Sequence, residues 1–148
     1  MATIPLIQQG TLNRVRTSVV IPSYTNLSIT SSYMGKNFAH LQPEGPLVDQ
    51  VETATGIVNS PVPYVMMKCV VDILRTQSLA EAWLQQIQVN SVIGEVITHA
   101  DTSAFSAITI NNASVVEFDP GAFDGKDPVF RLTLRGVFYS NNTLWNLV

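Results

Sequence analysis

The sequence predicts a mainly β fold: a β-barrel or sandwich of about seven or eight strands, with one flanking amphipathic α-helix and a long projecting loop. The clearest strand signal is VFRLTLRGVFY (129–139), in which apolar and polar residues alternate, so that one face of the strand is apolar. One segment, SLAEAWLQQIQV (78–89), repeats its apolar residues at helical spacing. Stretches rich in Pro, Gly, Asn and Asp separate the other β-rich runs, as turns between short strands do.

Residues 1–13 are predicted to form an arm, and residues 14–148 are predicted to form a single β-barrel domain. A chain of 148 residues can bury a core without needing disulfides or a structural metal. The first of its strands is expected to end at Pro22, which lacks the N–H that a central strand needs. Three strands are expected in this part of the domain, at 14–21, 27–32 and about 37–42.

A long interruption follows at residues 43–63, where six Pro and Gly residues break up the chain. Loops longer than about 12–15 residues are usually functional or disordered, so this segment is predicted to project from the barrel. Two short runs within it, LVDQV and TGIVN, can pair as a hairpin. Pro61 and Pro63 fix φ and remove two donors before the next strand, which suits a hinge between projection and barrel.

The second half of the chain holds the helix and the longest strands. The β-rich run YVMMKCVVDIL (64–74) precedes the helix, where Ser78 and Glu81 have the spacing of a capping box. The helix is expected to pack on the sheet through an apolar stripe of Leu79, Ala82, Trp83 and Ile87. Further strands are expected at 92–98, 107–118 and 129–139. The final stretch contains Trp145, an apolar residue that a free tail would not gain from exposing.

No motif in the sequence indicates catalysis. His40 and His99 have no ligand-like neighbours at metal spacing, and the acidic loop DPGAFDGKDP lacks the residue order of an EF-hand. Cys69 lies in the middle of an apolar strand face, as a small core residue does. A net charge of −3 and the lack of a basic run argue against a protein that grips phosphates. The sequence therefore predicts no enzymatic activity, no metal site and no cofactor.

Composition is compatible with a surface that partners cover. Only 13% of the residues are charged, against a usual fraction of about 25%. An ordinary monomer with a surface rich in Ser, Thr and Asn fits the composition equally well. The arm, the projection and the apolar C-terminal stretch favour assembly, because each can meet a neighbouring copy, and exposed strand edges can pair between chains.

The order of these parts resembles that of the tail tube proteins of contractile-tailed bacteriophages. Three stretches carry the resemblance: TNLSITSSYMGKNFAHLQPEG, TGIVNSPVPYVMMKCVVDILRTQSLAEAWLQQ and FRLTLRGVFYSNNTLW. Such proteins are similar in fold to the type VI secretion tube protein. The resemblance implies hexameric rings that stack into a hollow tube within a contractile sheath, in the phage virion, after assembly in the host cytoplasm. It also implies four kinds of partner: the sheath protein, the baseplate and tail terminator proteins, the tape measure protein in the lumen, and phage DNA that passes without specific binding.

Within this interpretation, several residues are expected at subunit contacts. Arg131 and Arg135 share the polar face of one strand, and they are expected to pair with acids of a neighbouring subunit rather than face the lumen; a solvated sheet face is an equal alternative. Acids of the projection are expected to face the lumen or the ring-to-ring contact. The full set of expected contact residues is Asp49, Glu52, Pro61, Pro63, Asp72, Arg131, Arg135 and Trp145.

Other functions stay open at this point. A tube initiator or baseplate component would have the same fold and the same sequence pattern. A β-sandwich that binds a ligand such as a carbohydrate would share the strand count, although it would usually cluster its exposed aromatic residues, which are dispersed here.

Overall fold

The computed structural model describes residue 7 and residues 9–146. Its described part contains nine strands, one α-helix and three short 3-10 helices, which confirms the predicted mainly β class with a single flanking helix. The strand count exceeds the expected seven or eight because the projecting segment pairs with itself.

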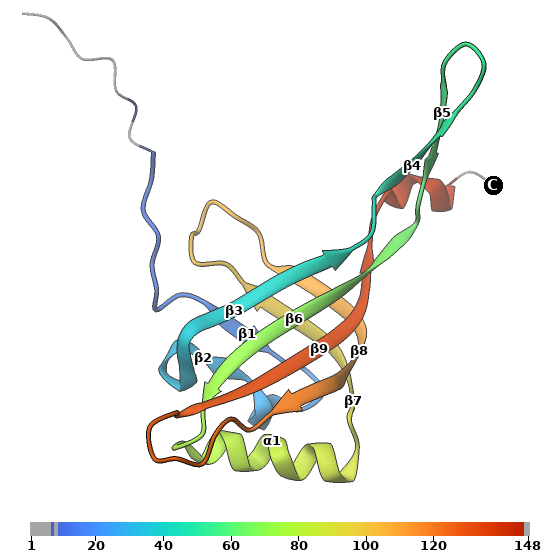
Figure 1. Ribbon diagram of the computed structural model, residues 1–148. Helices are drawn as coiled ribbons and strands as arrows, with labels where there is room; N and C mark the ends of the chain where they lie inside the picture. Colours follow the sequence, from blue (N-terminus) through green and yellow to red (C-terminus); the bar gives the residue numbers. More distant parts are fainter. Residues whose placement is uncertain (1–6, 8, 147–148) are drawn as a thin grey trace, which may run out of the picture.

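Seven strands form one antiparallel sheet that curls into a nearly closed barrel (Figure 1). Its strand order is β2-β1-β7-β8-β9-β6-β3. The two edge strands, β2 and β3, are consecutive in the chain and are joined by the 3-10 helix η2, Ser31–Tyr33. The bounds are β1 Ser18–Val20, β2 Ile29–Thr30, β3 Met34–Glu44, β6 Tyr64–Leu74, β7 Val92–His99, β8 Ile108–Asp119 and β9 Val129–Tyr139.

The longest ladders lie where the sequence pattern is strongest. Strands β6 and β9 pair over their whole length, from Tyr64 opposite Tyr139 to Leu74 opposite Val129. The apolar face of β9 points inward, where Phe130, Leu132 and Leu134 are buried, as the alternation predicts.

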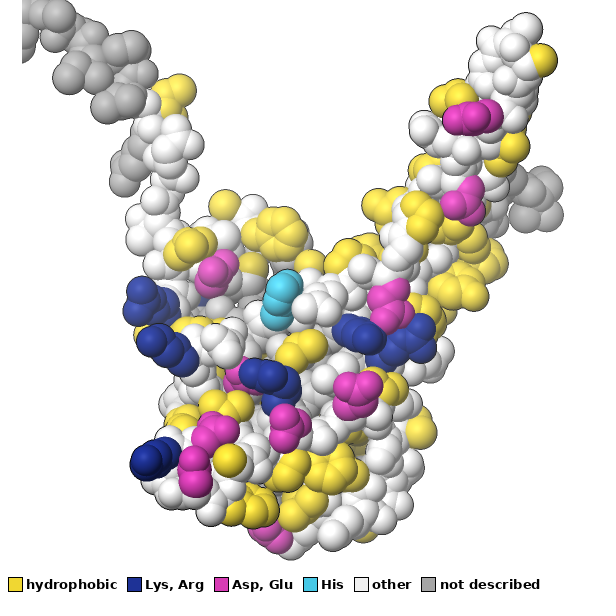
Figure 2. Space-filling view, in the orientation of Figure 1, with side chains coloured by type: hydrophobic (Ala, Val, Ile, Leu, Met, Phe, Trp, Pro, Cys, Tyr) yellow, Lys and Arg dark blue, Asp and Glu magenta, His cyan; other side chains and the backbone are white. Residues whose placement is uncertain are grey.

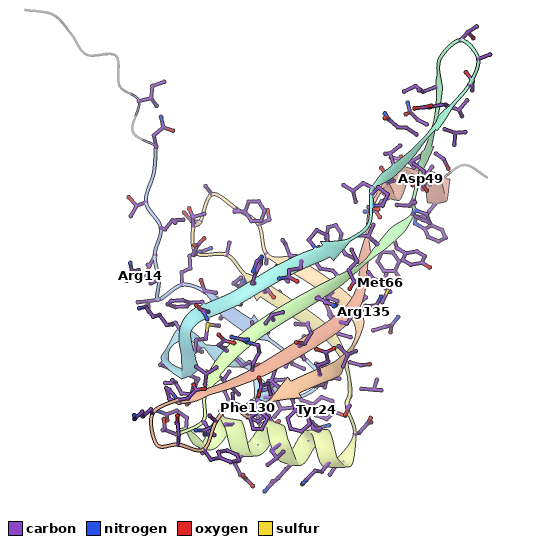
Figure 3. All side chains as sticks on the ribbon, viewed as in Figure 1. Arg14, Tyr24, Asp49, Met66, Phe130 and Arg135 are labelled. Atoms are coloured by element: carbon purple, nitrogen blue, oxygen red, sulfur yellow. The ribbon has the colours of Figure 1, made fainter. Side chains whose placement is uncertain are left out.

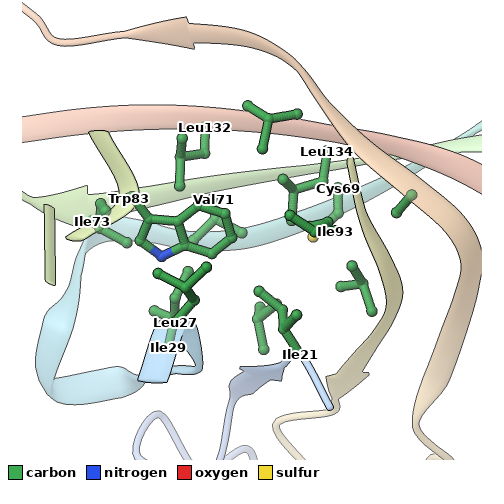
Figure 4. Packing of buried hydrophobic residues seen from close by; sticks show 14 of the residues in the cluster. Ile21, Leu27, Ile29, Cys69, Val71, Ile73, Trp83, Ile93, Leu132 and Leu134 are labelled. Atoms are coloured by element: carbon green, nitrogen blue, oxygen red, sulfur yellow. The ribbon is translucent and has the colours of Figure 1, made fainter. Parts of the chain in front are cut away.

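Helix α1, Ser78–Val89, lies across one end of the barrel (Figure 1). It inserts Trp83, which is fully buried, into the core beside Leu27, Ile29 and Leu132 (Figure 4). Leu79 is buried too, and Ile87 packs partly buried against the cluster, so the predicted apolar stripe of the helix is confirmed.

The predicted capping box is wrong. Gln77, not Ser78, is the N-cap residue, and its side chain makes no capping hydrogen bond. The cause is a tight turn after β6, in which the backbone N–H of Gln77 donates to the Leu74 carbonyl and that of Ala80 donates to the Gln77 carbonyl. The helix therefore begins one residue earlier than the spacing implied, and Ser78 is already helical.

The first two strands are shorter than expected. Residues 14–16 form a turn instead of a strand, because the Asn13 side chain accepts a hydrogen bond from the Val15 N–H and its carbonyl accepts one from Arg16. Strand β2 keeps only Ile29–Thr30 of the expected 27–32, since 3-10 turns flank it.

The projecting segment is a β-hairpin of β4, Val48–Glu52, and β5, Ile57–Pro61. Its strands pair from Val48 opposite Pro61 to Glu52 opposite Ile57, and Thr53 closes the turn by bonding Gly56. The hairpin forms its own two-stranded sheet and extends away from the barrel at the end opposite α1 (Figure 1).

Candidate assembly surface

Every residue of the two hairpin strands is exposed, so no part of the barrel covers either hairpin face. Cross-strand pairing places Val51 beside Val58 on one face, at 53% and 55% exposure, next to Asp49. The opposite face carries Ile57 across from Glu52. Each face thus combines exposed aliphatic side chains with one acid, a composition that suits contact with another molecule more than contact with water.

The base of the hairpin is held by the segment that follows β9. The Asn141 amide donates to the carbonyls of Leu47, at 3.0 Å, and of Val62, at 2.8 Å, and so bridges both legs of the projection. Ser140 adds two bonds, from its hydroxyl to the Val62 carbonyl at 3.0 Å and from its backbone N–H to the Pro63 carbonyl at 3.0 Å. These four bonds fix where the hairpin leaves the barrel, and we call them the base clamp.

The two prolines lie at this junction, as predicted, although a hinge role for them stays a prediction. Pro61 is the last residue of β5, and Pro63 directly precedes β6. The Val62 N–H between them donates to the Leu47 carbonyl at 3.0 Å, which extends the hairpin ladder down to the barrel.

Aromatic side chains surround the base clamp. Tyr64 and Tyr139 are opposite each other at the ends of β6 and β9, and both are about half exposed. Trp145, in the 3-10 helix η3 (Asn142–Asn146), is 60% exposed. Hydrophobic side chains accordingly gather on this side of the molecule, from the hairpin down to its base (Figure 2).

On the outer face of β3, β6 and β9, Arg131 pairs with Asp72 of the same chain. Its Nε lies 2.8 Å from Oδ1 of Asp72, and the Asn37 amide donates to Oδ2 at 3.0 Å. The Asp72 carboxylate is buried although Arg131 is not, because Asp72 and Arg131 are opposed on adjacent strands and the guanidinium covers the acid. Hydrogen bonding to Asp72 raises the pKa of Arg131.

Arg135 also has its acid within the chain. Its Nη2 lies 2.8 Å from Oε2 of Glu44, and Lys68 approaches the other oxygen at 3.4 Å. The hydrogen bond from Arg135 is the main cause that lowers the pKa of Glu44. This pairing corrects the expectation that both arginines pair with acids of a neighbouring subunit: strand register supplies the acids from β3 and β6. A place for this face in a subunit contact stays a prediction.

A pocket of about 420 Å³ opens beside the base of the N-terminal arm, between β3 and the end of β7. The Asp101 carbonyl anchors the arm here by accepting a bond of 2.7 Å from the Asn13 N–H. Arg14 lies at its rim, on the opposite side of the molecule from Asp49 (Figure 3). Its lining residues are Arg14, Thr17, Asn37, Phe38, Ala39, Leu41, Thr98, His99, Ala100, Asp101 and Phe105.

Cys69 and the acidic loop, which the sequence analysis considered as possible reactive or metal-binding sites, take part in the packing and hydrogen bonding of the fold. Cys69 is fully buried, and burial raises the pKa of its thiol to about 11. In the acidic loop after β8, the Arg75 guanidinium donates to the carbonyls of Pro120, Ala122 and Asp127 and lies 4.7 Å from the Phe123 ring centroid. Within residues 7 and 9–146, no group of three or more His, Cys, Asp or Glu residues could hold a metal ion. No helix in that same part has the length and apolar character to span a membrane.

One feature of this surface, the base clamp, was not predicted from the sequence. The base clamp joins Asn141 to Leu47 and Val62, which lie 94 and 79 positions earlier in the chain, and no local sequence pattern indicates such a contact. The only hint in the sequence is the residue type at position 141. The structure gives Asn141 a φ of 49°, and asparagine adopts this left-handed region more readily than most residues.

Comparisons with known proteins give few matches. No protein-family model matches the sequence. No curated protein matches it. Among solved structures, the tube-terminating cap of the anti-feeding prophage is similar over 93% of this chain and 97% of that chain, with 12% sequence identity and a TM-score of 0.49.

Proposed function

We propose that this protein is a structural subunit of a contractile tail, which polymerises with copies of itself as stacked hexameric rings to form the hollow tail tube. The observation that carries the proposal is the projecting hairpin with both faces uncovered. An isolated two-stranded hairpin is marginally stable in water. A projection whose valines and isoleucine are exposed on both faces is therefore best explained by burial against another subunit.

The open edge of the sheet supports the same proposal. Strand β3 pairs with β6 on one side and ends the sheet on the other. Exposed strand edges are sites where a second chain can add through backbone hydrogen bonds. Pairing at β3 would link neighbouring barrels around a ring, while the hairpin would extend beyond the barrel toward further copies.

The sequence resemblance to tail tube proteins specifies which assembly is proposed. It supplies the sheath, baseplate, tail terminator and tape measure proteins as partners, and the virion tail as the location. Passage of DNA without specific binding agrees with the net charge of −3, and with Lys68, Arg131 and Arg135 each lying beside an acid of the same chain. Cations neutralised within the chain gain little by releasing counterions from phosphates.

Electron microscopy and sedimentation of the purified protein test this proposal. We expect rings or hollow rods that sediment rapidly, and we expect Val51→Asp to shift the protein to small species, because it places a charge in the buried contact. Val89→Asp is the matched control, since Val89 is 84% exposed at the end of α1 and lies far from the hairpin. A monomer at every concentration tested would overturn the proposal, and rings that never elongate would favour a tube initiator or baseplate component.

A further inference from the structure

Two groups of charged side chains have no ion-pair partner in the described chain. Asp49 and Glu52 are the only charged residues between positions 45 and 63, so the hairpin is purely acidic. Arg14 and Arg16 lie in the exposed turn at the base of the arm. The ion pairs found among the described residues use Glu44, Lys68, Asp72, Arg131 and Arg135, and leave both groups free.

These two groups lie on opposite sides of the molecule. Figure 3 places Arg14 beside the arm and Asp49 at the hairpin, with the barrel between them. Figure 2 shows that the hairpin itself carries acidic side chains with no basic ones in view, while Lys and Arg lie on the barrel, some of them on the side of the arm. The hairpin points away from its own barrel and is held so by the base clamp, so its acids cannot meet these arginines within one chain.

The pocket at the arm has the composition to receive the hairpin. Phe38, Leu41 and Phe105 provide apolar lining, and Arg14 stands at the rim. Its volume of about 420 Å³ leaves room for the Val51 and Val58 side chains, which protrude together from one hairpin face next to Asp49. Asp101 also lines the pocket, but its one negative charge is smaller than the two positive charges of Arg14 at the pocket and Arg16 close to it in the chain. We call this pocket with Arg14 and Arg16 the basic shoulder.

The apolar hollow at the other end of the barrel is a poorer receptor. It has a volume of about 240 Å³ and is lined in part by Glu81 and Phe123. The neighbouring loop carries Asp119, Asp124 and Asp127 against a single lysine, and the Arg75 guanidinium there is already committed to three carbonyls. Hairpin acids would meet like charge at that end, which is unfavourable.

We propose that the hairpin of one copy docks on the basic shoulder of the next, with Val51 and Val58 in the pocket and with Asp49, on the same hairpin face, beside Arg14 and Arg16. Glu52 lies on the opposite face and adds to the negative charge of the hairpin. The contact is heterologous, because it joins two different surfaces of identical chains, and such contacts build rings or open arrays. The inference rests on the proposed function only in requiring that copies of the chain assemble.

Charge exchange between two variants tests the contact directly. The first variant carries Asp49→Lys with Glu52→Lys, and the second carries Arg14→Glu with Arg16→Glu; all four sites are exposed, so both variants are expected to fold. Each alone is expected to lose at least tenfold in the fraction that sediments as polymer, because its hairpin and shoulder have the same sign. An equimolar mixture is expected to regain assembly, since each hairpin then finds a shoulder of opposite charge on the other variant.

Cross-linking checks the geometry. Asp49→Cys, on the docking face of the hairpin, is mixed with Arg16→Cys under assembly conditions and treated with a short bis-maleimide, while the buried Cys69 stays unreactive. A covalent dimer is expected from this mixture, and none from Asp49→Cys mixed with Gln88→Cys, whose new thiol is exposed on α1. If the unmodified protein assembles but the mixtures give neither rescue nor this dimer, the docking site is wrong and the proposed function stands. If the unmodified protein never assembles, both proposals fall.

Discussion

At the scale of single residues, Arg131 and Arg135 show how burial of the acidic partner determines the contribution of an ion pair to stability. They lie on the same face of β9, four positions apart. Arg131 bonds Asp72 on the adjacent strand β6, and Arg135 reaches across β6 to bond Glu44 on β3. Asp72 is only 2% exposed, whereas the side chain of Glu44 is 33% exposed. Water can therefore replace Arg135 around Glu44, but it cannot readily replace Arg131 around Asp72.

We expect Arg131→Met to lower the free energy of unfolding by about 1–3 kcal/mol, the cost of leaving a buried charged acceptor without its partner. Methionine keeps most of the apolar stem of arginine, so the change reports on the lost guanidinium. Arg135→Met is the matched control, and it should leave the urea midpoint nearly unchanged because exposed ion pairs contribute little. Equal losses from the two variants would show that burial of Asp72 does not govern the effect.

At the scale of elements, the base clamp converts a flexible attachment into a defined one. A two-stranded hairpin without a core has no packing of its own to fix its direction. The direction comes instead from Ser140 and Asn141, which bond both legs where they leave the barrel. The end of the last β-strand thus orients a projection that is formed much earlier in the chain.

Asn141→Gly is expected to loosen this orientation without unfolding the barrel. Glycine tolerates the left-handed backbone of position 141, so the substitution removes the two amide bonds without adding backbone strain. Spin labels at Ala54→Cys on the hairpin tip and at Gln88→Cys on α1 should give a narrow distance distribution in the parent and a broader one in the variant. Asn142→Ala is the control, because the Asn142 side chain makes no hydrogen bond with the described residues. An unchanged distribution in Asn141→Gly would mean that the prolines or the Val62 bond orient the hairpin.

At the scale of the whole molecule, the parts of the fold that could be predicted are those that a short sequence pattern determines. Alternation identified β9, β-rich composition identified β6, and helical spacing identified α1. The turn at Arg14 and the true start of α1 were missed, since backbone hydrogen bonds to Asn13 and Gln77 overrode the side-chain pattern. The intrachain acids of Arg131 and Arg135 depend on strand register, which a single sequence does not reveal.

The proposed assembly surface also has one part that the sequence predicts and one part that it does not. The projecting hairpin was open to prediction, because Pro and Gly bracket two short β-rich runs. The basic shoulder was not, since it brings together residues from the arm, β3 and the end of β7. The composition was compatible with a surface that partners cover, but only the three-dimensional arrangement separates the acidic projection from a basic receptor.

The barrel has a packed core and the hairpin has none, so we expect the two parts to differ in hydrogen exchange, in free subunits and in assembled protein. In free subunits, the amides of residues 48–61 should exchange rapidly, because the hairpin is exposed on both faces and no core stabilises its ladder. The β6–β9 ladder should exchange slowly in both states, since it covers the buried cluster, and it serves as the internal reference. In polymerised protein, hairpin amides should slow by at least tenfold, because a local opening must then also break the contact between copies. Equal exchange of the hairpin in the two states would mean that polymerisation leaves it uncovered, and the contacts would then have to be sought along the free edge of β3.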